Sequence, residues 1–388
     1  MNILFDLIVM QQGKGYSGAA TYTQCVLNKL LERTTSEHAV YGLYDSSKEF
    51  TPHYNIPQVV KQHHIVLLDV HTNTIGQLIA QYHIDTYFVP LAQFIAPYDL
   101  SDINCRTVML IHDIFDVENN DSHLSLSLFD RNLTSKKEYL KHCIKILLNK
   151  YGQSVNRRYA GIMKLYNQPN VIAGTVSEYS KYALKYYFPE IEKDIHVWYS
   201  PAKQTQVNPA IDNPALSRYI QQQTKYFLMV SANRTFKNAQ LAVKAFKRFY
   251  QEHSDWHMIL INYPYSDDEN NIHSIKSLSD SDLEHAYKNA QALVFPSYFE
   301  GFGYPPIEAL KYGVPSIVSN VTSITELLTD SAYFFSPMYT ADLYRAMVKF
   351  SEQQDNLRPK KALQETYKRI HERQDADLEA LVNCILNQ

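Results

Sequence analysis

Short apolar runs rich in Val, Ile, Tyr and Phe alternate along this chain with longer amphipathic stretches, and the alternation occurs twice. Such a pattern is typical of repeated βαβ units, in which helices connect parallel strands. In the first half it predicts strands near residues 3–9, 39–44, 65–68, 85–89, 107–111 and 171–176. In the second half it predicts a helix at 239–250 and strands near 226–230, 257–261, 292–295 and 316–319. The sequence therefore predicts an α/β protein with two Rossmann-like domains.

The length of 388 residues exceeds what one hydrophobic core usually holds, so two domains of similar size are expected. The stretch 201–224 is polar, contains prolines and interrupts the hydrophobic periodicity, which is typical of a domain boundary. We therefore place the first domain at residues 1–200 and the second at 201–374, followed by a last helix at about 375–388. Because ligands of open α/β sheets bind beyond the carboxyl ends of the strands, chemistry is expected in the loops that follow strands.

Composition and charge exclude several classes of protein. A net charge of -3 argues against a general nucleic-acid binder, because phosphate backbones are held by a basic field. No apolar run approaches transmembrane length, and the first one lacks the basic lead and the cleavage site of a signal peptide. The cysteines are widely spaced, without metal or redox spacing, at Cys25, Cys105, Cys143 and Cys384. We expect reduced thiols and a cytoplasmic protein.

The segment 131–164 is strongly basic, although the whole chain is not. It contains nine Lys or Arg residues and one acid, Glu138. Within it, Leu140, Ile144, Leu147 and Tyr151 recur at helical spacing, which predicts an amphipathic basic helix. The more common outcome is a solvated basic face on a helix packed by its leucines. The alternative is peripheral contact with an anionic membrane, worth about 1 kcal/mol per basic residue near the surface.

The segment FPSYFEGFGYPPIEALKYGVPSIVSN, which begins at Phe295, carries the strongest signal in the sequence. It predicts a strand, a glycine-bearing loop, a short helix opened by prolines and another strand. Gly301 and Gly303 allow the backbone to turn tightly and approach a ligand, and Gly313 ends the helix. Amides at the helix start, together with the helix dipole, predict a site for an anion such as a diphosphate.

Two acidic side chains accompany this predicted anion site. Glu300 lies in the loop, and Glu308 is expected on the first turn of the helix. A carboxylate accepts hydrogen bonds from vicinal hydroxyls, so the pair suits a ribose or a hexose at different parts of one ligand. Taken singly, Glu308 could merely complement the helix dipole and Glu300 could be solvated. Their combination with the glycine loop favours a ligand.

Basic and imidazole side chains follow two other predicted strands. Arg234 and Lys237 lie in SANRTFKNAQLAVKAF, after the strand at 226–230, where cations would face a phosphate. His112 and Asp113 lie in VMLIHDIFD, at the carboxyl end of the strand at 107–111. A lone histidine is usually structural, but this one is expected at the ligand edge of the sheet.

These segments resemble the family 4 glycosyltransferases, retaining enzymes of the GT-B fold, in the form found among bacterial polysaccharide and lipopolysaccharide enzymes. Glu300 and Glu308 match the E-x7-E motif, and Lys237 followed by Asn238 matches the basic pair of the second domain. In the family the arginine directly precedes this lysine or lies five residues before it, whereas Arg234 lies three before. The strand-end His112 and Asp113 also match.

The resemblance implies a hexosyltransferase that uses a UDP- or GDP-sugar as substrate, without cofactor or metal, and a glycan or lipid-linked acceptor. It implies work in the cytoplasm, at the inner face of the plasma membrane, and a last helix that packs back on the first domain. Glu300 would contact the donor sugar, Glu308 the nucleotide ribose, and Lys237 and Arg234 the leaving phosphate, while His112 would contact the sugar. The other donor-binding positions are Gly15, Gly18, Asp113, Gly301, Phe302 and Gly303.

Competing interpretations remain. Gly13, Gly15 and Gly18 in QQGKGYSGAATY spell G-x-G-x-x-G, and Asp45 closes the second strand, as in an NAD-dependent oxidoreductase. A non-catalytic GT-B partner subunit and a sugar-nucleotide epimerase are further alternatives. Two metal-like spellings are discounted: Asp280 and Asp282 are expected to cap a helix, and His253 and His257 do not share one.

Overall fold

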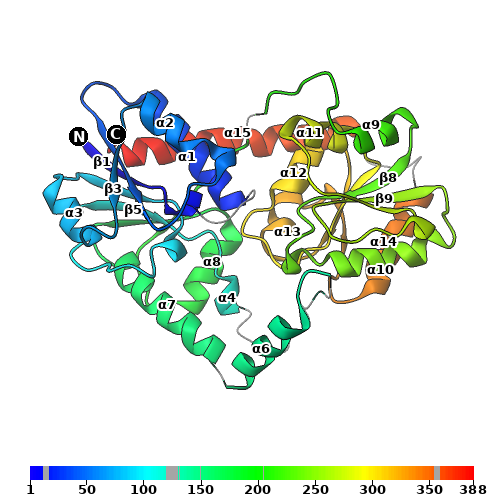
Figure 1. Cartoon of the computed structure of the whole chain (residues 1–388), viewed down its shortest axis with the longest axis horizontal. Coiled ribbons are helices and arrows are strands. Elements are labelled where there is room, and N and C mark those ends of the chain that lie inside the picture. Colours follow the sequence, from blue (N-terminus) through cyan, green and yellow to red (C-terminus); the bar gives the residue numbers. More distant parts are fainter. Residues whose placement is uncertain (12–16, 119–129, 131, 149, 204, 354–358) are drawn as a thin grey trace. The chain divides into compact units, whose positions relative to one another are not determined.

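The computed structural model describes residues 1–11, 17–118, 130, 132–148, 150–203, 205–353 and 359–388 (Figure 1). The chain divides into two compact units. The first unit contains Met1–Asn120, Asn149–Lys203 and Glu372–Gln388, and the second contains Asp121–Leu148 and Gln204–His371. Each unit is built on its own parallel sheet.

The sheet of the first unit has seven strands in the order β3-β2-β1-β4-β5-β6-β7, and every neighbouring pair is parallel. The central strands are buried on both faces, so their side chains form a continuous apolar core that includes Phe5, Tyr87 and Phe88. The strands are β1 Asn2–Asp6, β2 Ala39–Tyr44, β3 Val66–Asp69, β4 Thr86–Val89, β5 Arg106–Leu110, β6 Val171–Thr175 and β7 Ile195–Val197. The helices are α1 Gly18–Arg33, α2 Ile56–Gln62, α3 Ile75–Gln81, α4 Phe115–Glu118, α7 Lys150–Tyr166 and α8 Glu178–Tyr187, with short 3-10 turns at Ile8–Gln11, Pro52–Tyr54 and Ala92–Phe94.

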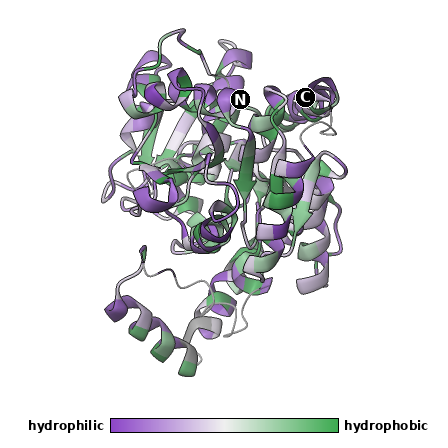
Figure 2. Ribbon diagram, turned by 90° about the vertical axis from the view of Figure 1, so that its right-hand side faces the viewer, coloured by the Kyte–Doolittle hydropathy of each residue, from purple (hydrophilic) through white to green (hydrophobic). Residues whose placement is uncertain are grey.

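The sheet of the second unit has six strands in the order β10-β9-β8-β11-β12-β13, again all parallel. The strands are β8 Lys225–Met229, β9 Trp256–Ile261, β10 Ile272–Ile275, β11 Ala292–Phe295, β12 Ser316–Ser319 and β13 Ala332–Phe335. The helices are α6 Lys136–Leu147, α9 Pro214–Gln221, α10 Ala239–Tyr250, α11 Asp280–Asn289, α12 Tyr304–Lys311, α13 Thr322–Leu328 and α14 Thr340–Glu352, with 3-10 turns η4 Thr235–Lys237 and η5 Asp268–Asn270. Helices of both units carry hydrophobic and hydrophilic residues together, as expected for amphipathic helices on a sheet (Figure 2).

Both strand orders reverse direction beside the first strand of the sheet, between β1 and β4 and between β8 and β11. This is the doubly wound arrangement, in which the loops that follow the two strands diverge and leave room for a ligand. The predicted two Rossmann-like domains are therefore confirmed. The loops after β8 and β11 are the ones that carry Arg234, Lys237, Glu300 and the glycines of the strongest motif.

The strands predicted near 39–44, 292–295 and 316–319 coincide with β2, β11 and β12, and the predicted helix at 239–250 coincides with α10. The prediction missed β7, β10 and β13, which all lie at the edges of the sheets. An edge strand pairs on one side only and is less buried, so its sequence shows a weaker apolar run. His196, His273 and Ser274 interrupt the apolar pattern of two of these strands.

Residues 121–148 group with the second unit, whereas the sequence placed them in the first domain. The described contacts give the reason. The carboxylate of buried Asp130 accepts a hydrogen bond of 2.8 Å from the hydroxyl of Tyr263, and Leu133 packs against the core of the second unit. The amide of Asn132 donates to the same tyrosine at 2.9 Å. These interactions attach the segment to the second unit just before α6.

The basic segment 131–164 forms two helices, α6 and α7, so the prediction of one basic helix was wrong. In α7 the apolar residues Val155, Tyr159 and Ile162 are buried in the first unit. In α6 the residues that the helical spacing predicted as packing positions are exposed: Leu140 by 60%, Ile144 by 47% and Leu147 by 83%. The expectation of a helix packed by its leucines is therefore wrong for α6.

The last helix, α15 Lys360–Ile385, begins earlier than the predicted 375 and runs through the boundary between the units at 371/372. Its second half belongs to the first unit, where the amide of Gln374 donates to the carbonyl of Ser200 at 2.6 Å. The carboxylate of Asp377 accepts from the backbone N–H of Tyr199 at 2.9 Å.

Among the residues that the structure describes, no helix is both long and apolar enough to span a membrane.

Candidate functional site

The candidate site of the second unit lies where β8 and β11 end. The two loops that follow these strands are joined by a backbone hydrogen bond from the N–H of Tyr298 to the carbonyl of Phe236, at 2.9 Å. The rings of Phe236 and Phe299 also contact each other, with centroids 4.6 Å apart. These contacts hold together two segments that are distant in sequence, and so bring Lys237 next to Glu300.

Lys237 and Glu300 form a buried ion pair. The ammonium Nζ of Lys237 lies 2.5 Å from Oε1 of Glu300, and the two side chains are exposed by only 7% and 11%. The ammonium also lies 4.4 Å from the centroid of the Phe295 ring, a cation–π distance. Burial lowers the pKa of Lys237, the carboxylate of Glu300 opposes that shift, and positive Arg234 adds to it. The pair places a positive and a negative group side by side at the ligand edge of the sheet.

Arg234 lies at the N-cap of the short turn η4, which ends at Lys237. Its guanidinium carbon is 5.9 Å from the centroid of the Phe236 ring. The electrostatic effect of Arg234 on Lys237 shows that the two cations share one region of the unit. Two positive groups therefore lie in this region with the carboxylates of Glu300 and Glu308, and they offer charge to a polyanionic ligand.

The loop that carries Glu300 is fixed by hydroxyl groups of the segment after β12. The N–H of Glu300 donates to the hydroxyl of Thr322 at 3.0 Å. The buried hydroxyl of Ser323 donates to the carbonyls of Glu300 and Phe302, both at 3.0 Å. These bonds satisfy backbone groups that a tight loop would otherwise leave unpaired.

Gly303 is the N-cap of α12 and has a φ of +99°, a left-handed conformation that glycine adopts without strain. A Cβ at this position would lie 2.3 Å from Cδ1 of Ile324. Both constraints explain why glycine opens α12, as the sequence predicted. Gly301 is half-buried, whereas the ring of Phe302 is buried, so Phe302 offers a ligand its backbone rather than its ring.

Glu308 is the fifth residue of α12 and lies on its second turn. The expectation that it lies on the first turn was wrong, because the helix begins at Tyr304, before both prolines. Its Oε2 accepts a hydrogen bond of 2.6 Å from the hydroxyl of Tyr287 on α11. The predicted end of the helix at Gly313 is confirmed: Gly313 has a φ of +67°, and the N–H of Val314 donates to Ala309 in a Schellman arrangement.

His112 and Asp113 lie in the first unit, directly after β5. The His112 ring is buried and meets the Tyr22 ring edge-on, with centroids 4.6 Å apart. Burial lowers the pKa of His112 to about 4, against the effect of a hydrogen bond with the backbone of Pro90. Its buried Nε2 has no hydrogen-bond partner among the described residues. A neutral imidazole with an unsatisfied nitrogen is suited to a hydrogen bond with a ligand.

Asp113 is engaged by its own loop. Its Oδ1 accepts from the N–H of Phe115 at 3.3 Å, and its carbonyl accepts from the amide of Gln93 at 2.7 Å. Gly18 is the first residue of α1, whose N-terminus is capped by the Ser17 hydroxyl. Gly13 and Gly15 lie outside the described residues.

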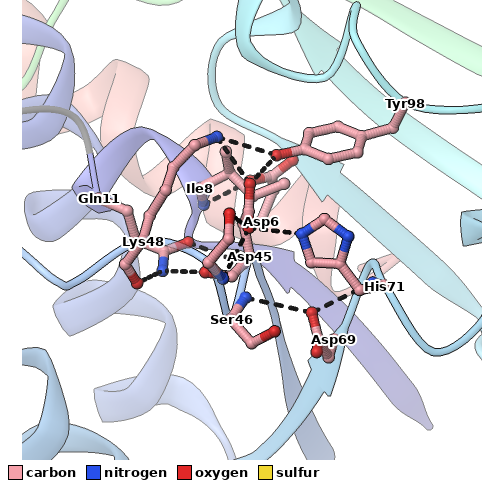
Figure 3. A network of polar contacts seen from close by, with 10 residues as sticks. Asp6, Ile8, Gln11, Asp45, Ser46, Lys48, Asp69, His71 and Tyr98 are labelled. Carbon is pink, nitrogen blue, oxygen red and sulfur yellow. Dashed lines mark hydrogen bonds and ion pairs between the residues drawn. The ribbon is translucent and has the colours of Figure 1, made fainter.

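Asp45, the acidic residue of the competing dinucleotide motif, is the centre of a polar network (Figure 3). Its carboxylate is buried and contacts Lys48 at 2.7 Å, the Nε2 of His71 at 2.7 Å and the hydroxyl of Tyr98 at 2.6 Å. Burial acts to raise its pKa, but hydrogen bonds from Lys48, Ser47, Tyr98 and His71 outweigh it and hold the pKa far below its usual range. A carboxylate with these partners is not available for the two hydroxyls of a ribose, which disfavours the oxidoreductase alternative.

Residues of the two sequence patterns that resemble metal motifs have partners within the protein. Asp282 is buried, and its carboxylate accepts from the N–H groups of Asp212 and Asn213 at 2.9 and 3.1 Å, near the start of α9. His257 lies in β9, and its Nδ1 is 2.9 Å from Nε2 of His273. In the part of the chain that the structure describes, no group of three or more His, Cys, Asp or Glu side chains is arranged to hold a metal ion.

The structure thus brings Arg234, Lys237, Glu300, Gly303 and Glu308 together in the second unit and places His112, Asp113 and Gly18 in the first. Sequence reasoning missed the residues that orient this set, namely Tyr287, Thr322 and Ser323. Thr322 and Ser323 follow a predicted strand and could have been suspected from that position. Nothing in the sequence indicated a role for Tyr287, because it lies on a helix that carries no recognisable motif.

Comparison with known proteins bears out the resemblance in the sequence. A family model described as glycosyl transferases group 1 matches residues 217–369. The match covers less than half of the chain. The matched range contains Arg234, Lys237, Glu300 and Glu308, so the candidate site of the second unit lies within it.

Two curated relatives of this chain are bacterial mannosyltransferases. The O-antigen chain mannosyltransferase B of Escherichia coli is 30% identical over 39% of this chain and 43% of its own length. The O-antigen chain mannosyltransferase RfbU of Salmonella typhimurium is 33% identical over 31% of this chain and 37% of its own length. The matches therefore span less than half of either relative.

The solved structure of Alr3699/HepE from Anabaena in complex with UDP-glucose matches this chain over its whole length. It covers 100% of this chain and 98% of that chain, with a TM-score of 0.63 and 13% identity. At this identity the likeness concerns the fold. The fold is GT-B, as the resemblance predicted.

Proposed function

We propose that the chain is a retaining glycosyltransferase that moves a hexose from a UDP- or GDP-sugar to a glycan or lipid-linked acceptor in cell-envelope polysaccharide synthesis. The single observation that carries this proposal is the buried Lys237–Glu300 pair at the reversal of strand order, beside Glu308 on α12. The names of the two curated relatives, both mannosyltransferases, support a hexose donor, with mannose as one candidate. The UDP-glucose complex of Alr3699/HepE supports a nucleotide-sugar donor.

The proposed chemistry follows from the charges of the site. The donor loses a nucleoside diphosphate, so the barrier falls when negative charge on the departing phosphate is stabilised. Lys237 and Arg234 supply positive charge for that phosphate. The N–H groups of Gly303 and Tyr304 supply hydrogen-bond donors at the start of α12, where Pro305 and Pro306 have none. Glu300 holds Lys237 in place and accepts from sugar hydroxyls, while Glu308 accepts from the ribose.

Retention of the anomeric configuration and independence from metal are parts of the same proposal. The departing phosphate would accept the proton of the acceptor hydroxyl on the face that it leaves, so neither glutamate acts as a nucleophile. The neutral His112 would donate or accept a hydrogen bond at the donor sugar through Nε2. The two cations take the electrostatic role that a divalent ion has in other transferases.

The test is ligand binding followed by analysis of the product. A ligand that binds only the folded state raises the melting temperature, so UDP, GDP and their hexose conjugates are compared by thermal shift with and without EDTA. We expect one nucleotide series to stabilise the protein equally in both conditions. Proton NMR of the product from the stabilising donor should show the donor's anomeric configuration. Inversion, or stabilisation that EDTA abolishes, would contradict the corresponding part of the proposal.

We also propose that the basic segment contacts an anionic membrane, and that α6 is the part that does so. Four lysines of α6, namely Lys136, Lys137, Lys141 and Lys145, are exposed. On the same helix Leu140, Ile144 and Leu147 are exposed as well. Such a helix lies in a lipid interface with its apolar residues among the acyl chains and its lysines near phosphate groups. The acceptor would then be reached at the inner face of the plasma membrane.

Vesicle sedimentation of the full chain tests the membrane proposal. We expect binding to vesicles that contain phosphatidylglycerol and weaker binding to pure phosphatidylcholine, since each lysine near an anionic surface contributes about 1 kcal/mol. Replacement of Lys137, Lys141 and Lys145 by Gln should reduce the binding. Replacement of the exposed lysines of α10, α14 and α15, Lys244, Lys349 and Lys361, is the matched control. Equal loss in both triple variants would mean that net charge, and not α6, determines the binding.

A further inference from the structure

Tyr287 lies outside every motif of the sequence, yet it contacts the candidate site. It sits on α11, is exposed by 1%, and its hydroxyl donates to Oε2 of Glu308 at 2.6 Å. Burial raises the pKa of Tyr287 well above its ordinary value, and the charges of Glu308 and Glu284 act in the same direction. The phenol therefore stays protonated and remains a donor to the carboxylate at any physiological pH.

The contact between α11 and α12 is polar along its length. Besides the Tyr287–Glu308 bond, Glu284 of α11 accepts from the ammonium of Lys311 at 2.9 Å and from the hydroxyl of Tyr312. These bonds fix the rotation of α12 about its axis relative to α11. The orientation of the Glu308 side chain is then set from a neighbouring helix and not by α12 alone.

We propose that Tyr287 is a positioning residue that aims the carboxylate of Glu308 at the ribose of the donor nucleotide. A short hydrogen bond from a hydroxyl to a carboxylate is charge-assisted and strongly directional. With Oε2 held by Tyr287, the plane of the carboxylate is fixed and Oε1 is presented to a diol. Without the hydroxyl, the carboxylate of Glu308 loses this restraint, and restoring its orientation when the ligand binds lowers affinity.

This inference rests on the proposed function, since it takes Glu308 as the ribose contact. It makes a prediction that a purely structural role of Tyr287 does not make. Loss of the hydroxyl should weaken binding of nucleotides that have ribose hydroxyls and leave binding of nucleotides without them unchanged. The ratio of the two affinities within one variant is insensitive to a general loss of stability, which affects both ligands equally.

The experiment measures, by calorimetry on the full chain, the affinities for UDP and GDP and for their 2′,3′-dideoxy forms. We expect the preferred ribonucleotide to bind Tyr287→Phe about tenfold more weakly than wild type, the size of one hydrogen bond to a charged group. The dideoxy form should bind both proteins equally. Tyr226→Phe is the matched control, because Tyr226 is also a buried tyrosine of this unit but donates to the carbonyl of Ala286.

Glu308→Gln separates the inference from the proposed function. If Glu308→Gln lowers the ribose preference and Tyr287→Phe does not, the role of Tyr287 is wrong and the ribose contact stands. If neither variant changes the preference, the ribose contact itself is wrong. An equal loss of both affinities in Tyr287→Phe would overturn the inference in favour of a structural role. Should Tyr287→Phe fail to fold, Tyr287→Met, which also removes the hydroxyl and introduces no hydrogen-bond donor, gives the same comparison.

Discussion

Removal of the ammonium from the Lys237–Glu300 pair tests both the stability and the chemistry of the site. In Lys237→Met the apolar stem remains and only the charge is lost, so the Glu300 carboxylate, 11% exposed, keeps its burial without its cation. Removing one partner of a buried pair typically costs about 3–5 kcal/mol. Because Arg234 lies in the same region, we take the lower end, about 3 kcal/mol. For a unit of this size that loss lowers the melting temperature by about 10 °C.

The double variant Lys237→Met/Glu300→Gln gives the internal check. A neutral amide in place of the carboxylate removes the unpaired charge, so the double variant should recover about 2 kcal/mol relative to Lys237→Met alone. Both proteins are compared by thermal and urea unfolding at pH 7.5. If the double variant is as unstable as the sum of the two single variants, the two groups are not coupled and the reasoning from burial fails.

The same variants report on catalysis. If Lys237 stabilises the leaving phosphate, Lys237→Met should reduce turnover at least about 10²- to 10³-fold, as for the loss of one preorganised donor. The double variant should regain stability without regaining turnover. Release of nucleoside diphosphate from the preferred sugar donor is the assay, at a temperature where all variants are folded. A Lys237→Met protein with wild-type turnover would refute the assigned role.

Four further results concern two glycines, Gly303 and Gly161, and two groups with shifted pKa values, His112 and Asp6. In Gly303→Ala the free energy of unfolding should fall by about 2–4 kcal/mol and most of the nucleotide affinity should be lost, because a Cβ would meet Ile324 at a φ of +99°. In Gly161→Ala, in α7 with open space around the residue, the free energy of unfolding should rise by about 0.5–1 kcal/mol. His112 has a pKa of about 4 in the folded state, below its value in the unfolded state. The free energy of unfolding should therefore fall by at most about 3 kcal/mol as the pH drops from 6.5 to 4. In urea titrations a His112→Gln protein should lack this pH-dependent loss. Asp6 behaves in the opposite sense: burial raises its pKa to about 7, its favourable contribution is lost as pH rises from 3.8 to 7, and Asp6→Asn should therefore melt above wild type at pH 8 but not at pH 4.

The central strands could be predicted from the sequence because strands buried on both faces read as continuous apolar runs. β11 and β12, whose residues are all buried, were placed to the residue for this reason. The edge strands β7, β10 and β13 could not, since β10, for example, carries His273 and Ser274 and pairs on one side only. Helix boundaries were less certain where a helix continues through a change of unit, as α15 does.

The candidate site was partly predictable for a similar reason. Gly303 and Gly313 could be predicted because a turn or a helix end requires glycine locally. Lys237 and Glu300 could be predicted because they follow strands. Tyr287 could not be found, since its role depends on which residue of α12 lies opposite it. The basic helix was misjudged because periodicity shows that a helix is amphipathic but not whether anything covers its apolar side.

The sequence by itself determined the local order of strand, loop and helix, and with it which side chains stand at the carboxyl ends of strands. That order depends on neighbours within a few residues, whose preferences act along the chain. Only the tertiary structure decided that the loops after β8 and β11 touch, so that Lys237 and Glu300, 63 residues apart, form one ion pair. The physical reason is that the order of strands in a parallel sheet arises from pairing between distant segments, which no short stretch of sequence encodes.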